Sequence, residues 1–494
     1  GTIADVAVYP NALNLTQVAR KEALDDHPSN NRQTIRDFNR PRGPIVSADG
    51  QVLARSAPLV GGDFEYQREY PLADYFSNIT GYYSYSFGTT QLEKVTNDVL
   101  MGDTTAQKAD SLFGGADNSG SVVLTIDAEL QKMAAQALLG GRTAEELLNF
   151  EGSVVVTDPT TGAVLAMFSY PTFNANQVAG HDTQAVEDAL NFLNQYPGKP
   201  LLANAYQERY MPGSSFKVVT TGIALENGIT SLDRSWPEET AWVPPQTTDP
   251  IQNYGGKSCG GTMAQVFYRS CNIPFAQLAV ELGAERMVAG TRAWGIGEEI
   301  PFDLPGAVAS NFENSGSDPI DFTNNQPLLA IGGFGQANDA MVPLHMCMVA
   351  ATVANGGRMM QPYVIDTLLD HDGLVLERTS PTVWKTPISP TTAGTLNGLM
   401  QQVVNTGTGT AMQLANGIQA AAKTGTAQLN ASGEPQRSHA WIVGFAPAEA
   451  PRYAIAVMIK GTTDEVSAST GGRLAGPIAK QILDYLFATE ENRQ

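Results

Sequence analysis

Alternating apolar and polar positions predict a sheet built from two distant parts of the chain. From residue 153 the text SVVVTDPTTGAVLAMFSYP reads as two strands joined by a Pro-Thr-Thr-Gly turn. Three more strand-like pieces follow much later: QAAAKTGTAQL from residue 419, HAWIVGFAP from residue 439 and YAIAVMIKG from residue 453. The text between is mostly helical, and a helix, KQILDYLFA, comes last. This order predicts an α+β layered architecture, an antiparallel sheet packed with helices.

The first 120 residues show a different pattern, short strand-like pieces separated by polar turns rich in Asn and Gly. The segment GGADNSG, residues 114–120, is typical of a linker. After it, SVVLTIDAELQKMAAQALLGG begins as a strand and continues with helical spacing. We therefore predict a smaller, mostly β N-terminal domain with its linker over residues 1–120, and a larger α+β domain over residues 121–494.

The charge balance narrows the possible partners. The 494 residues include 30 Lys and Arg against 50 Asp and Glu, a net charge of −20, and 42% of them are apolar. Such acidity argues against binding nucleic acid or an anionic membrane surface, so a neutral or cationic partner fits better. No run reaches the roughly 18 apolar residues that span a bilayer.

Metal and cofactor chemistry is not expected. The three cysteines and five histidines are scattered, with no CxxC or HExxH spacing. We predict no metal and no cofactor.

A serine and a lysine stand one helical turn apart in MPGSSFKVVTTGIALENG, residues 211–228. The Pro-Gly pair predicts a turn, and Ser214 and Lys217 would then share one face of the helix start. An amine buried at a helix N-terminus is disfavoured as a cation, so Lys217 could act as a base toward Ser214. An N-capping serine followed by a surface lysine fits the same text, and the pattern alone favours that plainer interpretation.

Two further clusters change this balance. In YRSCNIPFAQLAVELG, Ser270 and Asn272 fall in a break between two predicted helices, where a simple capping turn is the alternative. In AAKTGTAQL, residues 423–426 lie on a predicted strand that Gly425 interrupts, as happens where a ligand or another backbone comes close. A mobile edge strand is the alternative there.

The ordered set SxxK, SxN, KTG is much more specific than any of its members. It is the signature of β-lactamases and penicillin-binding proteins. On these motifs the chain resembles the penicillin-recognising transpeptidases, which implies their transpeptidase fold for the larger domain.

The resemblance covers most of the chain. Three segments are similar to the corresponding sequences of the family: PGSSFK, IGGFGQANDAMVPLHMCMVAATVANGG (residues 331–357) and HAWIVGFAP. RPRGPIVSADGQVLA resembles the start of the non-catalytic pedestal of class B, monofunctional penicillin-binding proteins, and YGGKSCGG followed by SCN resembles the actinobacterial penicillin-binding protein A group. No glycosyltransferase domain is visible.

The resemblance implies catalytic roles for five residues. Ser214 would attack the penultimate D-Ala carbonyl of a peptidoglycan stem peptide, with Lys217 as the base. Ser270, aided by Lys423, would relay a proton to the leaving amine, and Asn272 would hold the substrate amide.

The KTG strand would bind the substrate. Thr424 and Thr426 would receive the terminal carboxylate, beside Gly425. The backbone N–H groups of Ser214 and Thr426 would form the oxyanion hole.

The same resemblance implies partners and a location. The partners would be peptidoglycan stem peptides, β-lactam antibiotics and other cell-wall synthesis proteins, with no nucleic acid. The chain opens Gly1-Thr2 without a methionine, and we expect it to act on the extracytoplasmic face of the membrane, held by an N-terminal anchor outside this sequence.

Three alternative functions stay open. A β-lactamase of class A needs a glutamate from an ExxLN string after the nucleophile, but the two strings here, residues 145–149 and 187–191, both precede Ser214. A D,D-carboxypeptidase would pass the acyl group to water, and a β-lactam sensor would signal through membrane helices. The long pedestal-like N-terminal region favours a transpeptidase over both.

Two cysteines twelve residues apart suggest a bridge. Cys271 lies within SCN itself, and the text between it and Cys259 reads as a turn and two turns of helix that could bring the two sulfurs together. Two buried free thiols are the alternative. We predict the Cys259–Cys271 disulfide, with Cys347 as a free core thiol.

Overall fold

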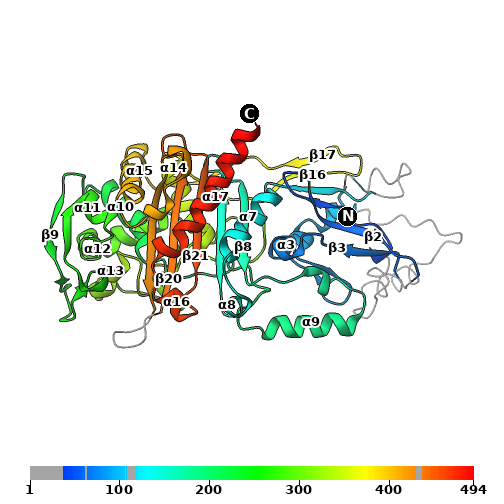
Figure 1. Cartoon of the computed structure of the whole chain (residues 1–494), viewed down its shortest axis with the longest axis horizontal. Coiled ribbons are helices and arrows are strands. Elements are labelled where there is room, and N and C mark those ends of the chain that lie inside the picture. Colours follow the sequence, from blue (N-terminus) through cyan, green and yellow to red (C-terminus); the bar gives the residue numbers. More distant parts are fainter. Residues whose placement is uncertain (1–36, 62–63, 106, 108–117, 430–436, 494) are drawn as a thin grey trace, which may run out of the picture.

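Two lobes lie end to end in the molecule (Figure 1). The computed structural model describes residues 37–61, 64–105, 107, 118–429 and 437–493. The N-terminal strands lie at one end, the green helices of the middle of the sequence at the other, and a central sheet stands between them. The predicted α+β class is confirmed.

The central sheet has five antiparallel strands in the order β19-β20-β21-β7-β8. It joins the two predicted groups, because β21 pairs with β7. The strands are β7 (Gly152–Thr157), β8 (Val164–Tyr170), β19 (Ala421–Gln428), β20 (Ser438–Ala446) and β21 (Tyr453–Ile459). The strand that carries KTG, β19, therefore lies at an edge of the sheet.

Helices cover both faces of this sheet, which explains why β7 and β20 are buried along their whole length. Alternate residues enter opposite cores: Val155 joins the larger core, whereas Val154 and Val156 join the smaller one. The helices packed on the sheet are α7 (Ala128–Leu139), α14 (Pro343–Ala354), α15 (Pro390–Asn405) and α17 (Gly471–Arg493).

The insertion between β8 and β19 was predicted to be mostly helical. Helices are its main regular elements, but less than half of its residues are helical, and it also carries short β-ribbons and long loops. Its main helices are α9 (Thr183–Gln195), α10 (Lys217–Glu226), α11 (Met263–Tyr268), α12 (Ile273–Ala293) and α13 (Gln326–Gly332). The ribbons pair β9 (Ser235–Glu239) with β12 (Cys259–Thr262), β10 (Ala241–Trp242) with β11 (Ile251–Gln252), β13 (Asn314–Ser315) with β14 (Asp318–Pro319) and β15 (Met359–Met360) with β18 (Val383–Lys385). Strands of two to five residues are too short to show a period-2 pattern.

The N-terminal lobe is built on a six-stranded sheet in the order β17-β16-β6-β1-β2-β3. Four of its strands are β1 (Ile45–Val46), β2 (Val52–Pro58), β3 (Tyr66–Glu69) and β6 (Ser121–Leu124). The other two, β16 (Ile365–Leu369) and β17 (Val375–Arg378), come from far along the chain, so the lobe is not continuous in sequence. The domain boundary after residue 120 stays a prediction.

A buried ion-pair network organises this lobe. The Glu93 carboxylate accepts hydrogen bonds from the Arg42 guanidinium at 2.5 Å, the Arg68 guanidinium at 2.7 Å and the Tyr70 hydroxyl at 3.0 Å. Two arginines outweigh the burial of this carboxyl and lower its pKa. Short elements lie around the network: α3 (Ala73–Thr80), β4 (Tyr83–Ser84), β5 (Gly88–Thr89), α4 (Gln91–Val95) and α5 (Asn97–Leu100).

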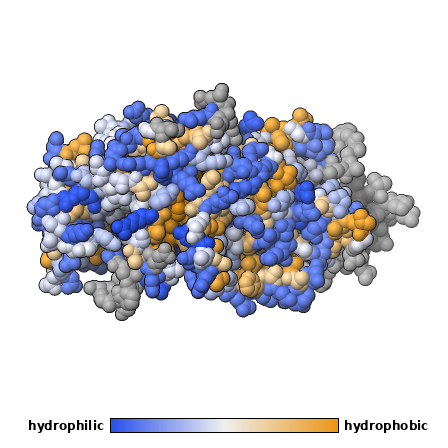
Figure 2. Space-filling model, in the orientation of Figure 1, coloured by the Kyte–Doolittle hydropathy of each residue, from blue (hydrophilic) through white to orange (hydrophobic). Residues whose placement is uncertain are grey.

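The surface in Figure 2 is largely hydrophilic, in keeping with the 50 acidic residues of the chain. No helix in the described part of the chain is both long and apolar enough to cross a membrane.

Candidate active site

Ser214 lies on a tight turn that the sequence forces. The 3₁₀ helix Gly213–Phe216 carries it and leads directly into α10. Gly213 has a φ of +54°, and a Cβ there would come within 2.5 Å of Thr426 O, so only glycine lets this turn lie against β19. Ser214 itself is only partly buried.

Lys217 points at this hydroxyl. Its Nζ lies 2.9 Å from Ser214 Oγ, and the side chain is fully buried. Nζ also contacts Ser270 O at 2.9 Å and Asn272 Oδ1 at 3.0 Å. Burial, and secondly the charge of Lys423, hold the pKa of the Lys217 ammonium well below its ordinary value. The amine is therefore suited to accept a proton from Ser214.

Ser270 joins the two lysines of the site. The Ser270 hydroxyl lies 2.9 Å from Lys423 Nζ and 3.4 Å from Lys217 Nζ. Burial lowers the pKa of the Lys423 ammonium to about 7. Ser214, Lys217, Ser270 and Lys423 thus form one continuous hydrogen-bonded chain.

Asn272 is the N-cap residue of α12 and is held by two residues of the ribbon region. Its backbone N donates to Asn253 Oδ1 at 2.8 Å, and its Nδ2 donates to Gln252 O at 3.1 Å. This leaves Oδ1 facing Lys217. No sequence motif indicated Asn253, because it follows β11, a strand of only two residues.

The KTG strand lies directly against the turn of the nucleophile. A Cβ at Gly425 would come within 2.5 Å of Pro212 O, so the glycine is needed for a close approach of two backbones. The Thr424 hydroxyl lies 2.5 Å from the Thr408 hydroxyl, and Thr426 Oγ1 accepts from Gly471 N at 3.3 Å.

Gln336 is a further contact of β19 that no motif indicated. With its amide oriented by its partners, Gln336 donates to Gln428 O at 3.1 Å and accepts from Gln428 N at 3.2 Å. Its neighbour Gly335 accepts a hydrogen bond from Gly213 N at 2.8 Å. One loop therefore holds both the turn of Ser214 and the free edge of the KTG strand.

All eight residues predicted for the site lie together in this region. The two ExxLN strings fall on α8 (Ala144–Leu148) and α9, where Glu145 and Glu187 are exposed. Among the described residues, no carboxylate hydrogen-bonds to Ser214, Lys217 or Ser270.

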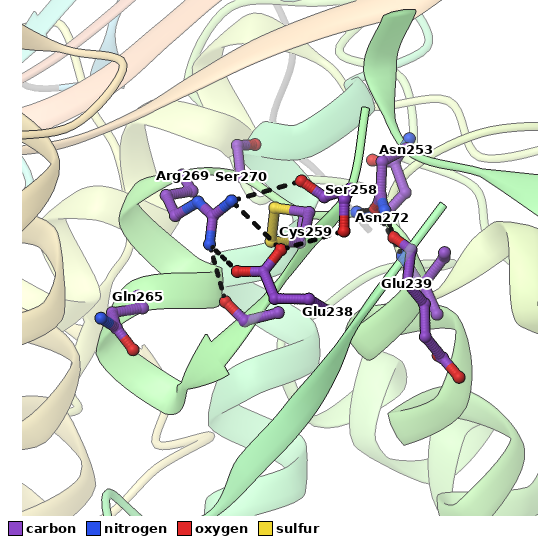
Figure 3. The surroundings of a disulfide bond; sticks show 12 residues. Glu238, Glu239, Asn253, Ser258, Cys259, Gln265, Arg269, Ser270 and Asn272 are labelled. Atoms are coloured by element: carbon purple, nitrogen blue, oxygen red, sulfur yellow. Dashed lines mark hydrogen bonds and ion pairs between the residues drawn. A yellow bond between two sulfur atoms is a disulfide. The ribbon is translucent and has the colours of Figure 1, made fainter. Parts of the chain in front are cut away.

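The predicted disulfide is confirmed. Cys259 and Cys271 are bridged, with Cα atoms 5.6 Å apart (Figure 3). Cys347 is a free, buried thiol 3.4 Å from the Thr157 hydroxyl, and burial raises its pKa to about 12.

A partly buried serine lies beside a fully buried lysine whose pKa is lowered, and a second serine–lysine pair completes the network. This arrangement defines a serine acyltransferase of the SxxK class. Comparison with known proteins gives the family: the chain belongs to the class B penicillin-binding protein transpeptidases. Residues 152–484 match the penicillin binding protein transpeptidase domain, and residues 42–123 match the penicillin binding protein A dimerisation domain. The family predicted from the motifs is confirmed.

The relatives are similar over nearly the whole chain. "Peptidoglycan D,D-transpeptidase PbpA" of Mycolicibacterium smegmatis is 35% identical over 96% of this chain and 94% of its own, and that of Mycobacterium tuberculosis is 33% identical over 96% and 95%. The ceftriaxone acyl-enzyme complex of M. tuberculosis penicillin-binding protein A is 30% identical, with a TM-score of 0.82 over 91% of this chain and 99% of that one.

Proposed function

We propose that this chain is a peptidoglycan D,D-transpeptidase that cross-links stem peptides through an acyl-enzyme on Ser214. The observation that carries the proposal is the 2.9 Å contact between the Ser214 hydroxyl and a fully buried Lys217. Two relatives that are 33–35% identical to this chain are named peptidoglycan D,D-transpeptidase.

In the acylation step, Ser214 Oγ attacks the penultimate D-Ala carbonyl and its proton passes to the neutral Lys217 amine. The N–H groups of Ser214 and Thr426 receive the oxyanion, each donor contributing about 2.7–4 kcal/mol in comparable enzymes. The peptide C–N bond then breaks, and the leaving D-Ala amine takes its proton through the Ser270 hydroxyl, beside Lys423. The acyl group of the donor remains bound to Ser214 Oγ as an ester.

In the second step, an amine of a neighbouring stem peptide attacks this ester. Its proton passes to Lys217, a new peptide bond forms, and Ser214 is released.

The donor binds before cleavage through its terminal carboxylate, which the hydroxyls of Thr424 and Thr426 and the charge of Lys423 hold. A β-lactam resembles the donor and acylates Ser214 in the same way.

We also propose an extracytoplasmic location, with an N-terminal anchor outside this sequence and other cell-wall synthesis proteins as partners. The disulfide supports the location, because such bonds persist in oxidising compartments.

We expect the penicilloyl adduct on Ser214 to be long-lived. Among the described residues, no carboxylate hydrogen-bonds to Ser214, Lys217 or Ser270, so the site lacks a counterpart of the glutamate that activates water in class A β-lactamases. Mass spectrometry after brief exposure to penicillin should find one adduct on the peptide 211–228 that persists for hours. Many penicillin molecules hydrolysed per enzyme within minutes would reassign the chain as a β-lactamase.

Acylation should have a bell-shaped pH dependence. The rate rises with pH as Lys217 loses its proton and becomes a base. It falls as pH rises through the pKa of about 7 of Lys423, because the charge that attracts the substrate carboxylate is lost. The measurement is the second-order acylation rate constant between about pH 5 and about pH 9. Lys423→Met should remove the falling limb, and a wild-type rate that still rises through pH 9 would contradict the assignment.

A further inference from the structure

Ser270 has a backbone conformation that serine rarely adopts. Its φ is +62°, and it directly follows Arg269, the C-cap of α11. Two hydrogen bonds close the helix end, from Ser270 N to Phe267 O at 3.1 Å and from Cys271 N to Val266 O at 3.0 Å. They form a Schellman motif, in which glycine usually takes the left-handed position because a Cβ is unfavourable there. The surroundings must therefore hold Ser270 in place.

Both neighbours of Ser270 are tied to the ribbon of β9 and β12, as Figure 3 shows. On one side, Cys271 is disulfide-bonded to Cys259 at the start of β12. On the other side, the Arg269 guanidinium donates to the Glu238 carboxylate of β9 at 2.6 Å and to a carbonyl oxygen of β12 at 3.0 Å. The ribbon thus holds the chain immediately before and immediately after the strained residue.

The Ser270 side chain extends away from these ties and contacts both lysines of the site. Its position relative to Lys217 and Lys423 therefore depends on a backbone that α11 alone does not stabilise. A displacement of Ser270 would lengthen its 2.9 Å contact with Lys423 and slow proton transfer to the leaving group.

We propose that the Cys259–Cys271 disulfide and the Arg269–Glu238 ion pair act together as a clamp that positions Ser270, and that a dithiol reductant slows acylation by opening this clamp. The inference rests on the proposed function. It adds four residues that position Ser270: Cys259, Cys271, Arg269 and Glu238. None of the four contacts the reacting atoms. They act through Ser270.

A dithiol opens the bridge by thiol–disulfide exchange. A dithiol attacks one sulfur of the bridge, the S–S bond breaks, and a mixed disulfide forms. Its second thiol then closes a cyclic disulfide, so that the reductant loses two electrons and two protons and Cys259 and Cys271 become thiols. The Arg269–Glu238 pair alone is exposed and weak, so it cannot replace the bridge.

The test compares acylation by a fluorescent penicillin in oxidised protein, in protein reduced with dithiothreitol and in Cys259→Ala/Cys271→Ala. The maximal acylation rate constant should fall about tenfold in both altered forms, a factor that corresponds to roughly 1.4 kcal/mol. The half-saturating penicillin concentration should stay unchanged, since Thr424 and Thr426 still bind the carboxylate. Titration of the denatured protein should count one thiol before reduction and three after it.

Two control variants separate the clamp from general stability. Cys347→Ala removes a buried thiol outside the clamp and should leave acylation unchanged. Glu238→Gln should lower the maximal rate constant further in the reduced protein, whereas Glu281→Gln, which breaks the Arg234–Glu281 pair of similar geometry, should not.

An unchanged maximal rate constant in fully reduced, folded protein overturns the clamp. A change in the half-saturating penicillin concentration alone, with the maximal rate constant unchanged, overturns it as well. If the double variant does not fold, reduced wild-type protein decides the question. A failure of oxidised wild-type protein to label at Ser214 would instead contradict the proposed function.

Discussion

Replacing Ser214 with alanine is expected to abolish covalent labelling by a fluorescent penicillin while leaving the fold intact. Among the described residues, only the Ser214 hydroxyl lies 2.9 Å from the buried Lys217 amine, and Ser214 is partly exposed. Without Oγ no acyl bond can form, so labelling should fall below detection rather than decline by a modest factor. The measurement is fluorescence of the denatured protein on a gel, with a thermal melt to confirm folding.

The adjacent serine provides the matched control. Ser215 is fully buried and donates to Pro212 O at 2.7 Å, so it supports the turn and takes no part in the chemistry. Ser215→Ala should cost about 1 kcal/mol of stability and still label. Undiminished labelling of folded Ser214→Ala, or complete loss in folded Ser215→Ala, would refute Ser214 as the nucleophile.

Replacing Lys217 with methionine is expected to lower the acylation rate constant by about 10²–10⁴-fold, the usual contribution of a general base. Methionine keeps an apolar side chain in this buried position and removes the amine. Lys217→Arg should lose as much, because arginine keeps the charge and does not give up its proton. Stopped-flow measurement of acylation at several penicillin concentrations gives the rate constant.

A lysine of the same lobe outside the site serves as the control. Lys385 pairs with Glu298 at 2.7 Å, and Lys385→Met should acylate at the wild-type rate. If Lys217→Arg retained most of the rate, Lys217 would act through its charge and the base would have to be sought elsewhere.

Local sequence was sufficient for much of this protein. Apolar runs with β-branched residues identified the strands of the central sheet, because strands buried on both faces leave a strong signal. The three motifs identified the family and predicted the nucleophilic serine and the two lysines, since their chemistry depends on residue type and on spacing within one helical turn or one strand. The disulfide was also predictable, because its two cysteines lie only twelve residues apart.

Tertiary structure alone decided how these pieces meet. The hydrogen bonds from Lys217 and Lys423 to Ser270 join residues 53 and 153 positions apart, and no local pattern encodes such distances. The same holds for Gln336 on the edge of β19 and for the β16–β17 hairpin, which leaves its sequence neighbours to complete the N-terminal sheet. The left-handed conformation of Ser270 is the clearest case. Serine does not favour it, and only the combined ties of a helix end, an ion pair and a disulfide to a distant ribbon hold it there.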